Sequence, residues 1–414
     1  MMNLKQIANN WRLPDYGIIL LILIFAVWNK AMPAVMVLCA LTLIAVRNDT
    51  KEIKKLFSIR YPFVWFVLFF LAHVSGMLNT TNTEFGVADI GMKASLIAVP
   101  IFLVSTKLRL KIKHIVNTYL IALLIAVLVC YSYAVFRSID APEDNHFGYF
   151  TESYFSFLMH RSYFATYLAL GALISIVRFF DDAKWRNYYF LLSVVFLVST
   201  VLTFSKAGIL ILLVLIVPIG YYLIAKHYKR GYAVLTVLFF IFAFAVGIGS
   251  SDRLSSRFEL MVNGFVNHQS TSNTSFESSA SRMIMWTTSL QLFSEHPFVG
   301  VGTGDVRDAL DQRNEELGNL GVVEHSLNSH NQYLNTGVQL GLVGLLPMFF
   351  AFLTSFAIAI RKRNLILFIT TSTFVLTMLF ESFLETQAGL IPVTLFLLLL
   401  SLKVLEKDKE HIQT

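Results

Sequence analysis

Apolar runs long enough to cross a lipid bilayer recur along this whole chain. The hydrocarbon core is about 30 Å thick, and a helix needs about 20 predominantly apolar residues to cross it. Of the 414 residues, 56% are hydrophobic and only 14% are charged, a composition typical of integral membrane proteins. The sequence therefore predicts an all-α integral membrane protein. We expect about twelve spans, near residues 16–29, 31–46, 61–78, 87–104, 115–136, 161–180, 188–204, 207–225, 232–249, 332–360, 364–384 and 388–404.

The predicted spans divide the chain into three parts. Residues 1–249 hold the first nine spans of a transmembrane bundle, although the first two are short and could form one re-entrant hairpin. Residues 250–331 form a large polar loop region between the ninth and tenth spans. Residues 332–414 hold the last three spans and a polar tail. We expect residues 282–294 to form a helix within the loop region, because apolar side chains recur there at helical spacing.

The basic residues predict the orientation of the spans. Lys and Arg are enriched in cytoplasmic loops, and alternate loops of this chain are basic, as at 107–113, 226–230 and 361–363. Both ends are then cytoplasmic, and the 250–331 region faces the opposite, periplasmic side. The net charge of +7 is spread over short loops and not gathered on one soluble face, which excludes a nucleic-acid partner.

Metal and disulfide chemistry are not indicated by the sequence. Cys39 and Cys130 both fall inside predicted spans, so they form no disulfide framework and no cysteine-based metal site. Asp181 and Asp182 lie in a basic inner loop and are interpreted as a solvated turn. Because no His/Glu cluster of metal-ligand spacing occurs on the outer side, we expect no metal and no cofactor.

Two cations are candidates for binding an anionic, lipid-linked substrate. Lys206 lies between two apolar runs with almost no loop between them, where an ionisable group is costly unless it has a function; it could instead extend its amine to the interface. Arg282 precedes the predicted loop helix. Its planar guanidinium suits paired phosphate oxygens, although a single loop arginine is more often solvated or salt-bridged.

His330 is the candidate general base, because it lies just before the tenth span and an imidazole titrates near neutrality. The competing interpretation is a histidine that only hydrogen-bonds at a helix start, with Asn331 as the helix cap. His325 is a weaker candidate, and Arg161 stands at another helix entrance on the outer side. The Gly300-x-Gly302-x-Gly304 motif lacks the βαβ context of a dinucleotide site and predicts a tight turn. We expect three glycines in the tenth span, Gly337, Gly341 and Gly344, to permit close helix packing.

In order along the chain, these motifs resemble those of the O-antigen ligase/polymerase superfamily of bacterial membrane glycosyltransferases. The motifs are Ser205-Lys206-Ala207-Gly208, Ser281-Arg282-x-x-x-Trp286, His296-Pro297 with the Gly-x-Gly-x-Gly turn, and His330-Asn331-x-Tyr333-Leu334. The resemblance covers roughly residues 190–400, and it is closest to O-antigen ligase. The segment from Glu381 to Gly389 also resembles an outer-edge segment of some members.

The resemblance implies transfer of a glycan from undecaprenyl diphosphate to lipid A–core at the outer face of the bacterial inner membrane. Lys206 and Arg282 would bind the diphosphate, His330 would activate the acceptor hydroxyl, and Glu381 or Glu385 would orient the histidine. The family usually has Arg where this chain has Lys206, and lysine lacks the two-pronged geometry.

Three alternatives remain open on sequence alone. A polymerase of the same superfamily and a protein O-oligosaccharyltransferase would carry similar motifs. A twelve-span transporter belongs to a different class. It should show paired broken spans with ionisable residues near the membrane midplane, whereas the candidates here gather at the outer interface.

Overall fold

The computed structural model describes residues 13–32, 34, 36, 58–106, 108–139, 146–228, 230–232 and 278–412. Within these ranges the protein is helical throughout and contains no strand. The α-helices are α2 (Leu13–Val27), α5 (Pro62–Gly76), α6 (Thr83–Lys93), α7 (Ser95–Ser105), α8 (Ile112–Ile139), α9 (Glu152–Phe155), α10 (Arg161–Asp181), α11 (Arg186–Leu202), α12 (Lys206–His227), α15 (Ser278–Glu295), α16 (Val306–Glu316), α17 (Leu320–Glu324), α18 (Gln332–Arg361), α19 (Leu365–Thr377) and α20 (Gln387–Ile412). Short 3₁₀ helices are η1 (Asn29–Ala31), η2 (Met77–Asn79), η3 (His146–Phe150), η4 (Ala183–Trp185) and η5 (Phe383–Glu385).

The all-helical membrane fold is confirmed for the described part of the chain. Eight candidate spans are long and apolar enough to cross a membrane, and two shorter apolar helices lie at Pro14–Val27 and Leu365–Thr377. These correspond to predicted spans. The predicted spans at 31–46 and 232–249 lie almost entirely outside the described residues, so the total of twelve, and the place of the large loop between the ninth and tenth, stay predictions.

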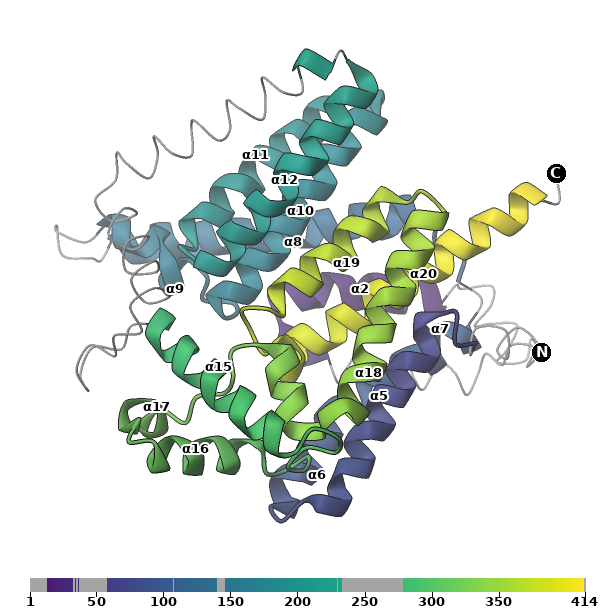
Figure 1. Ribbon diagram of the computed structural model, residues 1–414. Coiled ribbons are helices and arrows are strands. Elements are labelled where there is room, and N and C mark those ends of the chain that lie inside the picture. Colours follow the sequence, from purple (N-terminus) through teal and green to yellow (C-terminus); the bar gives the residue numbers. More distant parts are fainter. Residues whose placement is uncertain are drawn as a thin grey trace, which may run out of the picture.

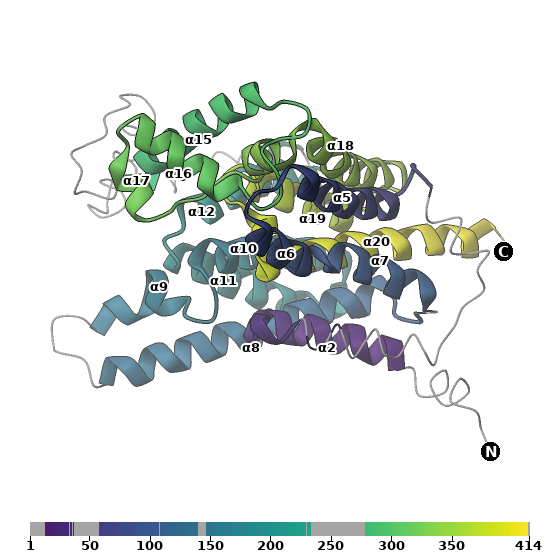
Figure 2. The same cartoon turned by 90° about the horizontal axis from the view of Figure 1, so that it is seen from below.

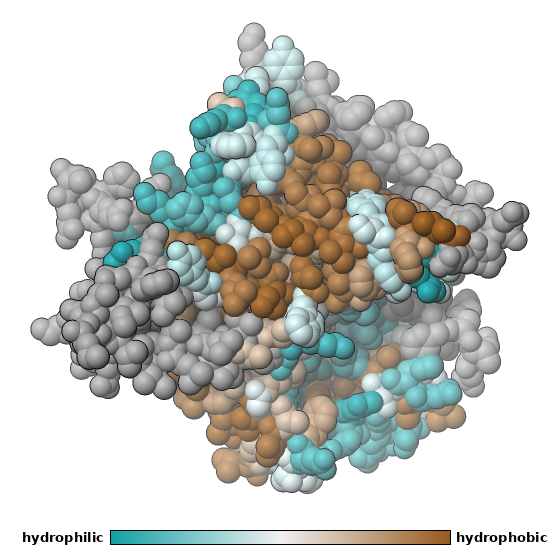
Figure 3. Space-filling view, turned by 180° about the vertical axis from the view of Figure 1, so that it is seen from behind, coloured by the Kyte–Doolittle hydropathy of each residue, from teal (hydrophilic) through white to brown (hydrophobic). Residues whose placement is uncertain are grey.

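The spanning helices form a bundle, and α15, α16 and α17 form a group at one end of it. Figures 1 and 2 show this group at the end opposite the C-terminal part of α20. Figure 3 shows apolar side chains across the middle of one face and hydrophilic residues toward two opposite ends. An apolar belt between two polar ends is the arrangement that a bilayer requires. The protein is therefore a membrane protein with a helical group at one of its polar ends.

The centre of the bundle is made by α10 and α20. Nearly every residue of α10 from Ser162 to Ser175 is buried, and in the spanning window of α20 the buried share is 89%. Tyr119 of α8 donates a hydrogen bond to the Tyr167 carbonyl at 2.7 Å, and its ring packs edge-on against Phe396. These helices are buried on most sides because other helices of the bundle surround them, and the few polar side chains on them, such as Thr166 and Thr394, are buried inside the protein.

Helix α18 is broken at Gly341, which differs from our expectation that this glycine only permits close packing. Gly341 has φ +59° and ψ −150°, a region essentially restricted to glycine. The turn after α15 fills the break, where Leu342 N–H donates to Pro297 O (2.8 Å) and Val343 N–H to Phe298 O (3.1 Å). In return, Val301 N–H donates to Val338 O (2.8 Å). The backbone groups freed by the break are thus satisfied inside the protein.

The tight turn predicted at the glycine motif is confirmed. Gly300 and Gly302 have φ of +69° and +121°, which glycine adopts without steric cost. A Cβ on Gly300 would also clash with the backbone of Gln339 in α18. The glycines therefore let the turn enter the break in the helix.

The predicted span at 364–384 is shorter in the structure. Helix α19 ends at Thr377, and residues 378–386 form turns and the short η5 helix. The end of this region contains the polar residues Glu381, Ser382 and Glu385, which are costly in lipid unless they are paired within the protein. Glu381 therefore lies in a connecting loop and not at the end of a helix.

Candidate functional site

The N-termini of α10 and α12 meet and place two cations side by side. Arg161 is the first residue of α10, and Lys206 is the first residue of α12. Ser205 caps α12 by accepting a hydrogen bond from Gly208 N–H at 3.2 Å. A Cβ on Gly208 would clash with Ala165 of α10, so this glycine allows the two helices to approach closely. The N-terminus of a helix favours anions, and both helices present theirs here.

A small polar cavity lies at this meeting point. Its empty space, counted together with the open solvent at its mouth, is about 280 Å³, and it is lined by Arg161, Ser162, Phe204, Ser205, Lys206, Ala207 and Arg282. Three of the lining residues are cationic, and they come from α10, α12 and α15. The cavity can therefore hold an anion against fixed positive charges contributed by three separate helices.

Arg282 enters the cavity from α15 and is held there by Glu381. One guanidinium nitrogen donates to Glu381 Oε1 at 2.9 Å, and the side chains are 16% and 6% exposed. A charge-assisted hydrogen bond shielded from water is stronger than a neutral one. This contact joins the outer helical group to the 378–386 loop.

His330 lies on the other oxygen of the same carboxylate. Its Nδ1 is 3.7 Å from Glu381 Oε2, and its side chain is 27% exposed. The backbone of His330 has φ +45°, a left-handed conformation that is uncommon for a residue other than glycine. Its N–H donates to the Asn328 side chain at 2.9 Å, which supports this conformation. Glu381 thus connects the histidine to the cationic cavity.

Asn331 caps α18, as the competing interpretation of this segment predicted. Its Oδ1 accepts from the N–H groups of Tyr333 (2.9 Å) and Leu334 (3.1 Å), and its amide donates to Leu379 O at 3.1 Å. The cap and the histidine are neighbouring residues with separate contacts. Capping by Asn331 is therefore compatible with a chemical role for His330.

The charges at the site keep Glu381 ionised. Burial acts to raise the pKa of its carboxyl group, but the neighbouring His330 and the Arg282 guanidinium outweigh burial and hold that pKa below its usual value. His160, which precedes α10, experiences the opposite balance, because burial lowers its pKa more than the charge of Glu381 raises it. At neutral pH the site therefore contains an anionic Glu381 and a neutral His160.

The structure brings most of the predicted site residues together. Lys206, Arg282 and Arg161 line the cavity, and Glu381 contacts both Arg282 and His330. His325 lies apart from the cavity lining, exposed at the C-terminal end of α17. Glu385 contacts Lys93, not His330, with its Oε2 2.8 Å from the ammonium nitrogen. Glu381 is thus the carboxylate placed to orient the histidine.

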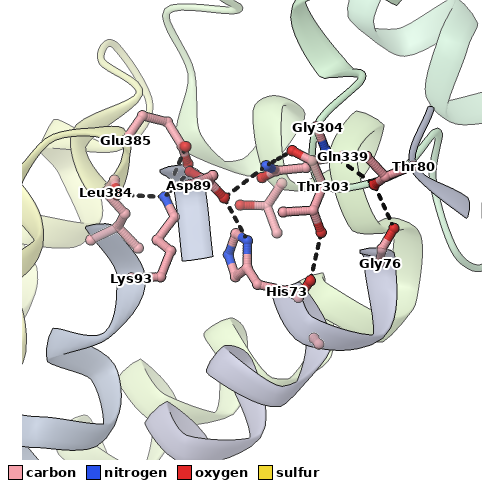
Figure 4. A network of polar contacts seen from close by, with 12 residues as sticks. His73, Gly76, Thr80, Asp89, Lys93, Thr303, Gly304, Gln339, Leu384 and Glu385 are labelled. Carbon is pink, nitrogen blue, oxygen red and sulfur yellow. Dashed lines mark hydrogen bonds and ion pairs between the residues drawn. The ribbon is translucent and has the colours of Figure 1, made fainter. Parts of the chain in front are cut away.

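Sequence reasoning missed a buried polar network beside this site (Figure 4). His73, Asp89 and Lys93 lie within the spanning helices α5 and α6, each at most 4% exposed. His73 Nδ1 is 3.1 Å and Lys93 Nζ is 3.7 Å from the Asp89 carboxylate, and Gln339 donates to Asp89 at 3.2 Å. The signal was in the sequence, because an Asp and a Lys four residues apart inside an apolar run are costly unless paired.

No metal centre is found in the parts of the chain that the structure describes, where no group of three or more His, Cys, Asp or Glu side chains could hold an ion. Cys130 is a free, buried thiol, and Cys39 lies outside the described residues.

The comparison with protein families agrees with this geometry. Residues 190–349 match the family described as O-antigen ligase. This part of the chain is similar to the O-antigen ligase family. The matched segment includes Lys206, Arg282 and His330, while Arg161 and Glu381 lie on either side of it. No curated protein matches the chain. The family indicates a membrane enzyme of the ligase and polymerase type, which joins a lipid-linked glycan to an acceptor.

Proposed function

We propose that this protein is an O-antigen ligase. It transfers a glycan from undecaprenyl diphosphate to the lipid A–core oligosaccharide at the periplasmic face of the bacterial inner membrane. The observation that carries the proposal is the chain of contacts from the cationic cavity through Arg282 and Glu381 to His330. These contacts place the proposed binding site for the substrate anion, the buried carboxylate of Glu381 and the candidate base His330 next to one another.

In this proposal the cavity binds the diphosphate of the donor. Arg161, Lys206 and Arg282 bring three positive charges; Arg282 is paired with Glu381, and Arg161 lies 3.9 Å from Glu152. When the bond between the anomeric carbon and the diphosphate oxygen breaks, negative charge grows on that oxygen. Preorganised cations stabilise such charge without reorganising during the reaction. We propose that these side chains fill the role that a metal ion plays in other glycosyl transfers.

His330 acts as the base that activates the acceptor. The hydroxyl oxygen of the acceptor forms the new bond to the anomeric carbon, and the proton passes to the imidazole. Because Nδ1 faces Glu381 at 3.7 Å, Nε2 is the nitrogen that receives this proton. The buried carboxylate of Glu381 stabilises the imidazolium that results. In other enzymes, too, a third group orients the catalytic base.

The proposal also assigns sides of the membrane and parts of the chain. Residues 250–331 form a periplasmic region that carries part of the site, between a bundle of residues 1–249 and the last three spans with a cytoplasmic tail at 332–414. Both termini are then cytoplasmic. The grouping of α15, α16 and α17 at one polar end (Figure 2) supports this assignment.

The alternatives differ in acceptor or in class. A polymerase would use a second carrier-linked unit as the acceptor, and a protein O-oligosaccharyltransferase would use a hydroxyl side chain. For a transporter, the break in α18 could have marked a binding site, but the backbone of residues 297–302 fills it, and the cationic cavity lies elsewhere. The ligase therefore remains the proposal that the site supports best.

The test is the lipopolysaccharide made by cells that carry His330→Ala. We expect the protein to reach the membrane at normal levels while lipopolysaccharide loses its long-chain ladder and carrier-linked polymer accumulates. We expect catalysis to fall by about 10²–10⁴-fold, the usual contribution of a general base. His114→Ala is the matched control, because His114 is exposed in the first turn of α8.

The gel pattern separates the alternatives. A normal ladder in His330→Ala cells would remove this histidine from the mechanism. A single repeat unit on the core would indicate a polymerase, and lost glycoprotein staining with intact lipopolysaccharide would indicate protein glycosylation. If a chelator stopped glycan transfer by the purified protein, a metal ion would be required. That result would contradict the proposed role of the Arg161, Lys206 and Arg282 side chains.

A further inference from the structure

Lys93 of α6 binds two residues of the 378–386 loop. Its ammonium group is fully buried and donates to the Leu384 carbonyl at 2.7 Å and to Glu385 Oε2 at 2.8 Å. It also lies 3.7 Å from Asp89 Oδ1 on the same helix. A buried ammonium surrounded by these acceptors is strongly favoured over any arrangement that leaves it unpaired. Lys93 therefore anchors the loop that carries Glu381 (Figure 4).

Gln332 ties the same loop to the segment that carries His330. Its side-chain amide donates to Glu385 Oε1 at 2.7 Å, and its Oε1 accepts from Leu384 N–H at 2.6 Å. Its backbone N–H donates to Met378 O at 2.8 Å. Gln332 is fully buried and lies two residues after the histidine. Both oxygens of Glu385 are thus shared between Lys93 and Gln332.

These contacts form a bridge beneath the site, made of Lys93, Glu385 and Gln332. Its middle residue, Glu385, belongs to the loop that carries Glu381, and it is held by Lys93 of α6 on one side and by Gln332 at the start of α18, next to the His330 segment, on the other. His330 Nδ1 and Glu381 Oε2 are 3.7 Å apart, which is too long for a strong hydrogen bond. The distance between the two side chains is therefore determined by the positions of their backbones. The bridge connects those backbones through buried side chains, in addition to the hydrogen bonds from Gln332 N–H to Met378 O and from the Asn331 amide to Leu379 O.

We propose that the Lys93–Glu385–Gln332 bridge positions Glu381 against His330 and Arg282 for glycan transfer. Lys93 and Gln332 are positioning residues, since they act through the loop and touch neither the cavity nor the histidine side chain. The proposal rests on the proposed function of His330. A displacement of about 1 Å at a reacting group can cost about 10²-fold in rate, so loosening the bridge lowers turnover without removing any group from the site.

The first experiment compares Lys93→Met with Lys403→Met in purified protein. Lys403 is a matched control, because it is also buried and donates to a backbone carbonyl (Leu108 O, 2.7 Å) and to a carboxylate (Glu406, 2.6 Å). Lys403 and Glu406 belong to the C-terminal half of α20, and Figure 1 shows this end of the helix opposite the α15, α16 and α17 group. We expect kcat of Lys93→Met to fall about 10²-fold, with KM for the lipid-linked donor changed less than about threefold, because Arg161 and Lys206 remain in the cavity. Lys403→Met keeps the wild-type kcat.

Two readouts separate positioning from a general structural role. The profile of kcat/KM against pH in Lys93→Met should take the shape of the Glu381→Gln profile, and Lys93→Arg, which keeps the charge and donors, should recover most of the turnover. A purely structural role would lower the yield of folded protein and leave the kcat and pH profile of that protein unchanged.

Gln332→Met decides the question if Lys93→Met does not fold. It removes the α18 side of the bridge and leaves the Lys93–Glu385 ion pair in place, and we expect the same fall in kcat. A folded Gln332→Met or Lys93→Met protein with wild-type kcat and pH profile overturns the bridge. His330→Ala is measured alongside. If that variant is active, the proposed function itself fails, whereas an inactive His330→Ala with a fully active bridge variant rejects the bridge alone.

Discussion

At the scale of single residues, Glu381 connects the parts of the site. One oxygen binds Arg282 of α15 and the other faces His330, and its side chain is only 6% exposed. A carboxylate buried to this degree is stable only because both neighbours are cations or potential cations. The role that the resemblance offered to Glu381 or Glu385 is consistent with the contacts of Glu381 alone.

Replacing Glu381 tests this arrangement through the pH dependence of stability. Its pKa is lower in the folded protein than its usual value of 4.5, so the ionised carboxylate contributes stability that is complete above pH about 4.5 and is lost as pH falls through the lower, folded value. We expect Glu381→Gln to cost about 2 kcal/mol of unfolding free energy at pH 7. The difference from wild type should shrink below pH about 4.

Thermal unfolding in detergent at a series of pH values measures this difference. Glu315→Gln is the control, because Glu315 is exposed on α16. A gap between wild type and Glu381→Gln that stays constant from pH 7 down to pH 3 would contradict the assigned charge state.

Lys206 shows how a departure from the family pattern can be accommodated. A lysine has a compact charge and cannot bind two phosphate oxygens as a fork. In this cavity Lys206 stands beside Arg161 and Arg282, which both have planar guanidinium groups. In the proposed function, the arginines supply the paired recognition of the diphosphate, and Lys206 adds charge at the start of α12.

At the scale of elements, the break in α18 determines where the outer turn sits. The turn at residues 297–302 inserts its backbone where the helix loses its own hydrogen bonds. Thr303, which follows the turn, donates to His73 O at 2.6 Å and accepts from Gln339 at 2.8 Å through its carbonyl. The broken helix, the turn and α5 are therefore joined by polar contacts within the protein (Figure 4).

Gly341→Ala tests the importance of this break. Alanine at φ +59° is strained, and its Cβ would meet the backbone of Phe298, so we expect a loss of at least about 2 kcal/mol. Gly220→Ala is the matched control, since Gly220 lies in helix α12 with open space around it. There alanine should be neutral or stabilising by up to about 1 kcal/mol.

Unfolding temperature and transfer activity are measured together for both glycine variants. Gly341→Ala should lose both, because the first part of α18 carries the segment after His330. Equal stability of the two variants would show that α18 tolerates a continuous helix.

At the scale of the whole molecule, the polar ends show which helices lie at the same end of the bundle, and the side of the membrane that each end faces is a proposal. The inner loops were predicted from their basic residues, and the structure places α15, α16 and α17 at one end of an apolar belt. The cavity lies where α10 and α12 begin and where Arg282 of α15 enters. In the proposed function, the lipid tail of the donor stays in the bilayer while its diphosphate binds at this level.

Cysteine labelling in whole cells tests the orientation. In a background with Cys39→Ala and Cys130→Ala, we expect Leu320→Cys to react with a membrane-impermeant maleimide once the outer membrane is opened. Trp185→Cys should react only after the inner membrane is permeabilised. Both side chains are exposed, at 58% and 50%, so accessibility within the protein does not limit either reaction. The reverse pattern would place the proposed site in the cytoplasm.

The sequence by itself determined the membrane class, the positions of most helices, and the residue types at the site. Hydrophobic length is a local property, and a bilayer selects it directly, so α8, α10 and α12 were predicted nearly at their observed bounds. The ordered motifs identified Lys206, Arg282 and His330 for the same reason, since each lies in a short, recognisable stretch.

Only the tertiary structure decided which charges meet. The choice of Glu381 over Glu385 as the partner of His330, the pairing of Glu385 with Lys93, and the turn that fills the break at Gly341 all depend on segments far apart in the chain. A local sequence pattern does not specify which distant residue will pair with a buried charge. Any partner of opposite charge and suitable geometry would stabilise that charge. The packing of the helices selects that partner.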